Sequence, residues 1–326
     1  LTNTGIIPRA LNPGARDELL QQQFCNGKKT LLAGAKRILP GETVGIENGE
    51  ARKLCLRQLL PEMGPQNWSE EEALKMLDDA LMNSVMVHQR SDVPYGMFLS
   101  GGVDSSAILA CMRELNDRPV EAFTVGFSGT HVPDERAHAE RVAKAAGARF
   151  HAVNFSEDDF WNLLPEIVSA LDDPTTDYAI LPTYKLAGFV RNRGLKVILS
   201  GEGGDELFAG YGRYRRLLRP RWLGGRSMRR KGLFDGENIL RAEDGEWRDT
   251  SEPVQLVETW SKLQQAQAED CQNWLPNDLL IKLDRCLMSH GVEGRTPFLD
   301  PEVASVAFNL PDALKVRGGR GKYLLR

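Results

Sequence analysis

The sequence predicts an α/β protein: a parallel twisted sheet with helices on both faces, preceded by a β-rich segment and followed by a mainly helical part. Two observations support this class. Nearly continuous apolar segments alternate with segments of helical periodicity between residues 94 and 200, and such strands are typical of parallel sheets that helices cover on both sides. Two similar glycine-rich turns also follow two of these apolar segments, at 100–105 and 200–206.

The first sixty residues carry few regular signals. Their clearest feature is "PGETVGIENGEARKLCL" at 40–56, which predicts two short strands around a turn at Asn48 and Gly49. This unit is too short to be a whole domain. A boundary is therefore expected at "PEMGPQNW", residues 61–68.

A helix is predicted directly after this boundary. Ser69 followed by Glu72 is a capping-box pattern, and an apolar stripe at helical spacing continues to about residue 92. The residues expected on its buried face are Leu74, Leu77, Leu81 and Val85.

The central part of the chain is expected to alternate between strands and helices. Strands are predicted at 94–100, 121–127, 149–155 and 195–200, helices at 105–115, 134–147, 157–171 and 181–194, and a mainly helical region at 252–315. In open parallel sheets ligands bind beyond the carboxyl ends of the strands, where the strand order reverses. The two glycine-rich turns both lie at such ends, so they are expected to form one site.

The composition excludes several classes of function. The chain is 41% hydrophobic and 26% charged, with a net charge of -4, so no overall basic field would draw it to nucleic acid or to an anionic membrane. No apolar run approaches membrane-spanning length. The five cysteines are scattered without a CxxC pair, which argues against a disulfide framework or a zinc site and favours a cytoplasmic location. Each cysteine is expected to be a small buried residue.

One segment stands apart in charge. Residues 213–231 contain nine Arg or Lys and no acid. They lack interleaved aromatic residues suited to base stacking, so a nucleic-acid partner is not predicted. We interpret the segment as a solvated stretch near the mouth of the site.

The first turn, "SGGVDSS" at 100–106, combines glycines, hydroxyls and one acid. Backbone N–H groups in a strand-to-helix turn form an anion-binding concavity, and Asp104 would repel a bare phosphate unless Mg²⁺ lay between them. The turn lacks the lysine of a P-loop and is not GxGxxG, so neither γ-phosphate transfer nor dinucleotide binding is favoured. The alternative is an ordinary Gly-Gly turn whose Ser and Asp side chains cap the helix.

The second turn, "SGEGGDE" at 200–206, repeats this layout with three acids, Glu202, Asp205 and Glu206. Carboxylates crowded at the end of a strand repel one another unless they share a cation. A helix N-terminus accounts for one or two of these acids, but not for the same layout in both turns.

Three stretches then carry a family resemblance: "SGGVDSS", "SGEGGDELFAGY" at 200–211, and "KLDRCLMSHGVEGRTPFLD" at 282–300. The chain resembles the synthetase domain of glutamine-dependent asparagine synthetases of the B type, within the PP-loop ATP pyrophosphatase superfamily. A fourth stretch, "TLLAGAKRILPGE" at 30–42, resembles the end of the family's N-terminal nucleophile glutaminase domain. β-Lactam synthetases share this architecture, so the motifs are more specific for the superfamily than for the substrate.

The resemblance implies a domain division. Residues 1–60 would be the C-terminal remnant of a glutaminase domain, and 61–326 an ATP-binding synthetase domain that is incomplete at its C-terminus. The chain starts at Leu1 without the family's nucleophilic cysteine, so these residues are not expected to hydrolyse glutamine. The lysine with which the family contacts phosphate is expected beyond Arg326, and Lys322 is not matched to it.

Site roles also follow from the resemblance. The residues implied to bind ATP are Leu99, Ser100, Gly101, Gly102, Asp104, Ser105, Val125, Phe127, Ser200, Gly201 and Glu202. Mg²⁺ would be bound by Asp104 and Asp205. Catalytic roles would fall to Glu202 and Asp205, with Glu293 and Arg295 at the acceptor end. The alternative for the last two is a structural ion pair.

The implied reaction is amide formation with ATP and Mg²⁺. Aspartate would react with ATP to give β-aspartyl-AMP and pyrophosphate, and ammonia would then displace AMP to give asparagine. The implied partners are small molecules, and a homodimer stays open because the family often forms dimers. Three alternatives stay open as well: an amidotransferase for a sugar, peptide or secondary-metabolite carboxylate, a tRNA-thiolation enzyme, and a catalytically incomplete binding module. The acidic charge and the missing CxxC pairs disfavour the thiolation enzyme.

Overall fold

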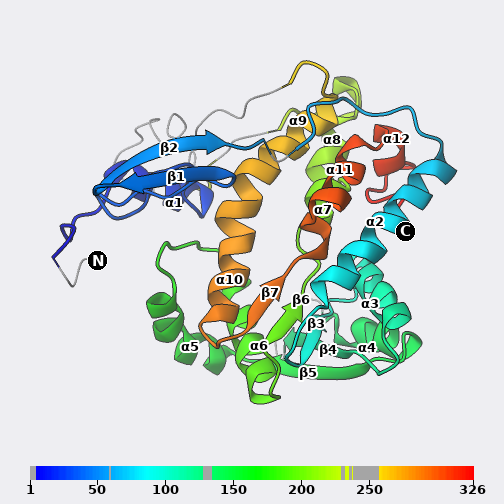
Figure 1. Ribbon diagram of the computed structural model, residues 1–326, viewed down its shortest axis with the longest axis horizontal. Helices are drawn as coiled ribbons and strands as arrows, with labels where there is room; N and C mark the ends of the chain where they lie inside the picture. The colour runs from blue at the N-terminus through cyan, green and yellow to red at the C-terminus, as the bar shows by residue number, and fades with distance from the viewer. Residues whose placement is uncertain (1–4, 59, 128–133, 229–231, 235–236, 238–256) are drawn as a thin grey trace.

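The fold is built on one parallel sheet, as predicted. The computed structural model describes residues 5–58, 60–127, 134–228, 232–234, 237 and 257–326. The sheet has the order β5-β4-β3-β6-β7, from β3 (Tyr95–Phe98), β4 (Glu121–Phe127), β5 (Arg149–Phe155), β6 (Val197–Leu199) and β7 (Glu293–Arg295). Figure 1 shows it at the opposite end of the molecule from the first strands of the chain.

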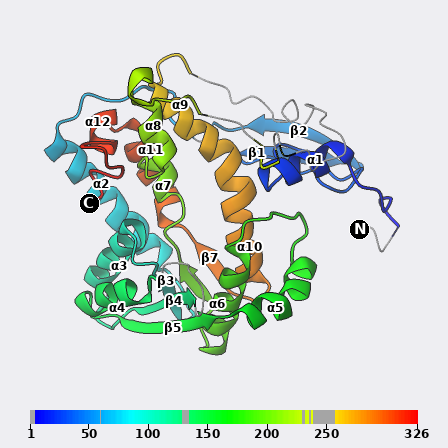
Figure 2. The same ribbon diagram turned by 180° about the vertical axis from the view of Figure 1, so that it is seen from behind.

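Helices cover both faces of this sheet (Figures 1 and 2). One face meets α2 (Glu70–His88), α3 (Val103–Leu115) and α4 (Arg136–Ala145), and the other meets α5 (Glu157–Ala170), α6 (Ile180–Asn192) and α10 (Leu280–Met288). Because successive side chains of a strand point to opposite faces, Leu199 joins the first core and its neighbour Ile198 the second. The α/β class predicted from the sequence is confirmed.

The order of the strands fixes where a site can form. The chain runs outward from β3 through β4 to β5, then returns to place β6 on the other side of β3. Residue Tyr95 pairs with Val197, and Met97 with Leu199, so the turns that follow β3 and β6 leave the sheet side by side. This is the point at which strand order reverses, where open parallel sheets bind their ligands.

The predicted capping box at the start of α2 is present. Ser69 Oγ accepts a hydrogen bond from Glu72 N (3.2 Å), and Glu72 Oε2 accepts one from Ser69 N (2.9 Å). The buried stripe is displaced from the predicted one, because Leu74 is 52% exposed. The hydrophobic residues buried on the helix are Ala73, Leu77, Ala80, Leu81 and Val85. Small alanines complete the stripe, and the leucine beside it faces water.

The N-terminal segment contains the predicted hairpin and one unpredicted helix. Strands β1 (Glu42–Glu47) and β2 (Glu50–Leu56) are antiparallel, and both turn residues have positive φ, 53° at Asn48 and 82° at Gly49. The helix α1 (Pro13–Gln22) begins after Asn12, whose side chain accepts a hydrogen bond from Ala15 N. Asparagine before proline is a helix-start signal that could have revealed it.

The C-terminal part is mainly helical, as predicted for the described residues 257–315; residues 252–256 lie outside the described part. One continuous rod contains α9 (Lys262–Glu269), a π-helix labelled η3 (Asp270–Leu279), and α10. The remaining short helices are α7 (Gly204–Leu207), α8 (Gly212–Leu217), η1 (Arg221–Leu223), η4 (Pro297–Leu299), α11 (Pro301–Asn309) and α12 (Asp312–Lys315).

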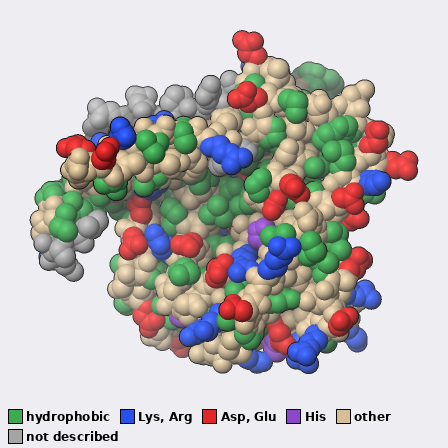
Figure 3. Space-filling view, in the orientation of Figure 1, with side chains coloured by type: hydrophobic (Ala, Val, Ile, Leu, Met, Phe, Trp, Pro, Cys, Tyr) green, Lys and Arg blue, Asp and Glu red, His purple; other side chains and the backbone are tan. Residues whose placement is uncertain are grey.

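Other sequence-based expectations have mixed outcomes. All five cysteines are free, and Cys25, Cys111 and Cys286 are buried. Cys55 is exposed, contrary to expectation, because β2 has no buried residue. No helix in the described ranges has the length and apolarity that crossing a membrane requires. On the face that Figure 3 shows, acidic and basic side chains are interspersed.

Candidate active site

Hydrogen bonds within the first turn hold its shape, and the backbone N–H groups at the start of α3 are not capped by a side chain in the described residues. Gly101 has a φ of 78°, and a Cβ there would lie 2.8 Å from His138 Cδ2, so only glycine fits. Ser100 Oγ lies 3.1 Å from Ser105 Oγ and accepts a hydrogen bond from Gly102 N. In the described part of the chain no side chain caps α3 at Gly102, so the interpretation of Asp104 as a helix cap is wrong. The turn therefore offers backbone donors and hydroxyls to an anion.

The second turn lies directly against the first, as the sequence predicted. A Cβ added at Gly204 would lie 2.5 Å from Asp104 Cγ. Any side chain at this position would therefore push the two turns apart. The close approach brings the carboxylates of Asp104 and Asp205 to a common cation, which is the ammonium group of Lys322.

Lys322 is the residue that the sequence analysis missed. Its Nζ donates a hydrogen bond to Asp104 Oδ2 and lies 2.7 Å from Asp205 Oδ1, and its backbone N donates to Phe208 O (2.9 Å). Lys322, which the sequence analysis did not match to the family's phosphate-contacting lysine, therefore lies in the candidate site. Motif matching discarded Lys322, and its position depends on the tail returning to the sheet, for which the local sequence carries no signal.

Asp104 is the most informative group of this cluster. Burial raises the pKa of its carboxyl above the ordinary value, and the ammonium of Lys322 opposes that rise. Its Oδ1 is buried and has no hydrogen-bond partner among the described residues. Mg²⁺ usually takes one or two carboxylates and phosphate oxygens, so the unpaired oxygen, with Asp205 beside it, fits a magnesium ion. Among the described residues no group of three His, Cys, Asp or Glu is placed to hold a metal.

Glu202, in the second turn, interacts with a second polar cluster that contains Lys282 and Asp177. Burial raises the pKa of Glu202, and Lys282 opposes the rise. Lys282 Nζ donates to Asp177 Oδ2 (2.6 Å). Burial likewise raises the pKa of Asp278, which accepts a hydrogen bond from Thr175, to about 6. Sequence reasoning found Glu202 and missed these neighbours, because they come from α10, the π-helix and the segment before α6.

The Arg295 carbonyl accepts a hydrogen bond from Ser200 N (2.8 Å), at the start of the second turn, but the side chains of Glu293 and Arg295 make other contacts. Arg295 Nε donates to Glu293 Oε1 (2.8 Å), and its Nη1 donates to the carbonyl oxygens of His88 and Arg90 (2.8 Å each). The guanidinium thus ties the edge of the sheet to the end of α2. This arrangement favours the structural ion pair over the catalytic role that the sequence analysis gave these residues.

Three residues that the resemblance implied to bind ATP have side chains that pack in the hydrophobic core. Leu99 is 1% exposed, and Phe127 makes an edge contact with Phe155 at 5.9 Å between ring centroids. Val125 contacts the two cores on the α5 and α6 side of the sheet. Their role in ATP binding stays a prediction that involves their backbone groups.

Glu206 is expected to make stability depend on pH. It is 1% exposed, and burial raises its pKa from 4.5 to about 7, although Tyr211 donates a hydrogen bond to it. The folded state then holds the proton more tightly than the unfolded state, so stability falls as pH rises from 4.5 to about 7. Glu206→Gln is expected to remove this fall, worth up to about 3 kcal/mol.

Urea unfolding at several pH values checks this expectation. The exposed Glu71→Gln is the matched control, and it is expected to keep the wild-type pH dependence. If the Glu206→Gln curve ran parallel to the wild-type curve over that range, the assignment to Glu206 would be wrong.

Lys315 is linked to the second turn by hydrogen bonds through Gln267. It is fully buried, and its Nζ donates to Gln267 Oε1 and Phe308 O (2.8 Å each). Gln267 Nε2 donates in turn to the carbonyl oxygens of Glu206 and Leu207 (2.7 and 2.6 Å). Burial lowers the pKa of Lys315 to about 7. One buried ammonium group thus braces α7 through Gln267.

Lys315→Met is expected to destabilise the protein by about 1–3 kcal/mol, because it leaves the buried Gln267 Oε1 without this donor and removes one of the two donors to Phe308 O, the other being Gln264 Nε2. The free energy of unfolding in denaturant measures the effect. Lys262→Met, at an exposed position of α9, is the control. Equal stabilities for the two variants would contradict this role for Lys315.

The fold and the paired turns define an α/β protein with its site at the switch point of a parallel sheet. Residues 76–326 match the family model described as Asparagine synthase. The chain therefore belongs to the asparagine synthase family, whose named members are carbon–nitrogen ligases.

Three relatives illustrate the similarity. The chain is 32% identical to glutamine-hydrolysing asparagine synthetase 1 of Bacillus subtilis, with 95% of this chain and 55% of that protein covered. It is 27% identical to glutamine-hydrolysing asparagine synthetase B of Escherichia coli (99% and 53% covered). It is 25% identical to the amidase chyE of Penicillium rubens (94% and 58% covered). The chain spans about half the length of the curated relatives it matches.

Proposed function

We propose that the chain catalyses ATP-dependent amide formation, converting aspartate, ATP and ammonia into asparagine, AMP and pyrophosphate. The observation that carries this proposal is the meeting of Asp104, Asp205 and Lys322 between two turns at the switch point of the sheet. Membership of the asparagine synthase family supports the class of reaction.

The first turn would hold the pyrophosphate part of ATP. The uncapped N–H groups at the start of α3 and the hydroxyls of Ser100 and Ser105 are suitable donors. The ammonium of Lys322 would offset the charge of the phosphates. Asp104 and Asp205 would hold Mg²⁺, which when bound supplies a Lewis acid for phosphate oxygens.

In the adenylation step, an oxygen of the aspartate β-carboxylate attacks the α-phosphorus of ATP. The bond from that phosphorus to the β-phosphate oxygen breaks, and pyrophosphate leaves. Negative charge grows on pyrophosphate in this step, next to the donors of the first turn and to Lys322, which favours the transition state. No side chain has to move a proton here, so positioning by the two turns is the main contribution.

In the second step, ammonia attacks the activated carbonyl carbon, AMP leaves, and the nitrogen loses a proton. Glu202 would line the place where aspartate and ammonia meet. With Asp177 and Asp278 it forms a group with more carboxylates than the one lysine, Lys282, neutralises, and such a group favours an ammonium or amino group.

Several further assignments rest on this proposal. Residues 1–60 would be the end of a glutaminase domain, which would supply the ammonia from glutamine in the way the names of the relatives suggest. Residues 61–326 would be the ATP-binding synthetase domain, which would act on small molecules in the cytoplasm as part of a homodimer.

The full chain incubated with ATP, Mg²⁺, an ammonium salt and a panel of carboxylates tests the proposal. AMP and pyrophosphate that appear only with aspartate are expected. ADP and phosphate as products would overturn the PP-loop assignment.

A second candidate is an amidotransferase for another carboxylate. The similarity to the amidase chyE over 94% of the chain supports this second candidate. AMP release that depends on a different carboxylate of the panel would select this candidate.

A further inference from the structure

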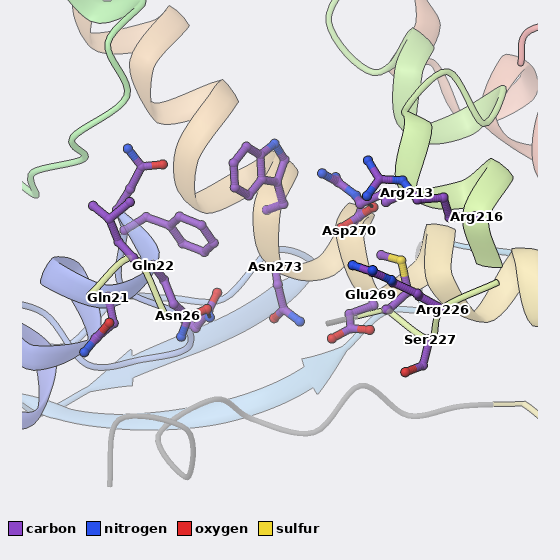
Figure 4. Close-up of a pocket in the computed structure, with 15 residues that line it drawn as sticks. Gln21, Gln22, Asn26, Arg213, Arg216, Arg226, Ser227, Glu269, Asp270 and Asn273 are labelled. Atoms are coloured by element: carbon purple, nitrogen blue, oxygen red, sulfur yellow. Dashed lines mark hydrogen bonds and ion pairs between the residues drawn. The ribbon is translucent and has the colours of Figure 1, made fainter. Parts of the chain in front are cut away.

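The arginine-rich segment has no part in the proposed reaction, yet it lines a cavity. The cavity has a volume of about 390 Å³ and lies between the end of α1, the α8 segment and the π-helix (Figure 4). It shares no lining residue with the two turns of the active site. Its size is within the range of small-molecule sites.

The described part of the segment differs from the solvated stretch that the sequence predicted. Tyr214 is fully buried, and its hydroxyl donates a hydrogen bond to Asp270. Arg213 Nε donates to Asp270 Oδ2 (3.0 Å), and its guanidinium lies 4.2 Å from the ring centroid of Tyr211. These contacts correct the expectation for residues 213 and 214 and hold one arginine rigidly at the cavity; residues 229–231 lie outside the described part.

Two more arginines extend the positive side of the cavity. Figure 4 shows Arg216 and Arg226 beside Arg213. Within the described ranges, no carboxylate forms an ion pair with either of them, whereas Asp270 is already paired with Arg213. Glu269 also lines the cavity, so three guanidinium groups face two carboxylates. The balance of charge favours an anionic ligand.

The other side of the cavity adds an apolar surface and an unused donor. Phe24 and Trp274 meet edge to face, with ring centroids 5.5 Å apart. Trp274 Nε1 is buried and, in the part of the chain that the structure describes, has no hydrogen-bond partner. A buried N–H without an acceptor is costly, so the ligand is expected to bring acceptor oxygens. The π-helix contributes Asp270, Asn273 and Trp274 to one side of the cavity, and π-helical turns are frequent at functional sites.

We propose that this cavity binds a small organic oxyanion, a carboxylate or a phosphate monoester on an apolar or aromatic body. Arg216 and Arg226 bind the oxyanion, because guanidinium groups match carboxylate and phosphate geometry. Phe24 and Trp274 contact the apolar body.

The site is coupled to the active site by direct contacts. The guanidinium of Arg213 lies over Tyr211, and the Tyr211 hydroxyl donates to Glu206 Oε1 (2.7 Å) in α7, next to Asp205. Arg213 is therefore connected to the second turn through the ring of Tyr211.

Calorimetric titration of the full chain without ATP tests the proposal independently of the reaction. Phenyl phosphate and benzoate are the two oxyanion probes, and benzyl alcohol is the neutral probe with a similar body. One oxyanion is expected to bind with a stoichiometry of one, and the neutral probe is not. Binding of phenyl phosphate alone assigns a phosphate ligand, and binding of benzoate alone assigns a carboxylate ligand.

Matched variants locate the binding. Arg216→Gln/Arg226→Gln is expected to weaken it at least about tenfold, and Trp274→Phe several-fold. Arg219→Gln/Arg221→Gln removes the same charge from exposed arginines outside the cavity and is expected to leave affinity unchanged. Equal weakening by the two double variants would show attraction by net charge only and overturn the proposal. Absence of saturable oxyanion binding, or equal binding of the neutral probe, would overturn it as well.

Discussion

Asp205→Asn is expected to reduce pyrophosphate release by at least about a thousandfold while the fold stays intact. The substitution keeps the shape of the side chain and removes its charge. The neutral amide pairs less well with the ammonium of Lys322, which lies 2.7 Å from Asp205 Oδ1 in the wild type. It also leaves Asp104 as the only carboxylate of the pair that would hold Mg²⁺. Both losses fall on the step in which pyrophosphate leaves.

A coupled pyrophosphate assay with ATP, aspartate and ammonia measures this effect. Asp92→Asn, at an exposed position in the turn before β3, removes the same charge away from the site and is expected to have wild-type activity. Circular dichroism and the unfolding midpoint establish that the variant is folded. Pyrophosphate release at the wild-type rate would remove Asp205 from the site.

Lys322→Met is expected to damage both activity and stability. It leaves the carboxylates of Asp104 and Asp205 together without the ammonium that lies between them. Removing one partner of a buried ion pair costs about 3–5 kcal/mol, and the loss of a cation beside the leaving pyrophosphate is expected to slow adenylation at least about a hundredfold.

The stability loss of Lys322→Met has a defined dependence on pH. Burial already raises the pKa of Asp104, and Lys322 is the group that opposes it most. Without the lysine the folded state binds a proton at Asp104 more tightly, so the variant recovers stability as the pH falls. Unfolding in urea at pH 5 and pH 8 measures this recovery.

A compensating variant separates the two roles of Lys322. Lys322→Met/Asp104→Asn removes the more buried of the two uncompensated carboxylates, so it is expected to regain most of the lost stability and to stay inactive. A Lys322→Met variant with an equal stability loss at both pH values would contradict the account of Asp104.

The sequence was sufficient to predict the elements whose structure depends mainly on neighbouring residues. The strands 121–127 and 149–155 were predicted to the residue, because an apolar segment of that length bounded by polar turns has few alternatives. The two turns were placed at one site because parallel strands end at the same edge of the sheet.

Long-range contacts account for what the sequence could not provide. Glu293 and Arg295 stand in a family-like motif, but the partners of Arg295 are carbonyl groups at the end of α2, 207 and 205 residues earlier in the chain. Asp177 joins Asp278 and Lys282, which lie four residues apart on one helical rod, only because two distant segments meet beside Glu202. Leu74 was misplaced because leucine outweighed the alanines in the apolar pattern.

The salt bridge between Asp104 and Lys322 has a consequence for the order of folding. The two residues are 218 positions apart, and contacts of such separation form late because a long loop must close first. Until that loop closes, the two acids at the switch point repel each other, while the helices of the first layer can already be in place. We therefore expect this contact to complete the site after the sheet has formed, and we expect ATP or Mg²⁺ supplied during refolding to favour the finished form by binding to it.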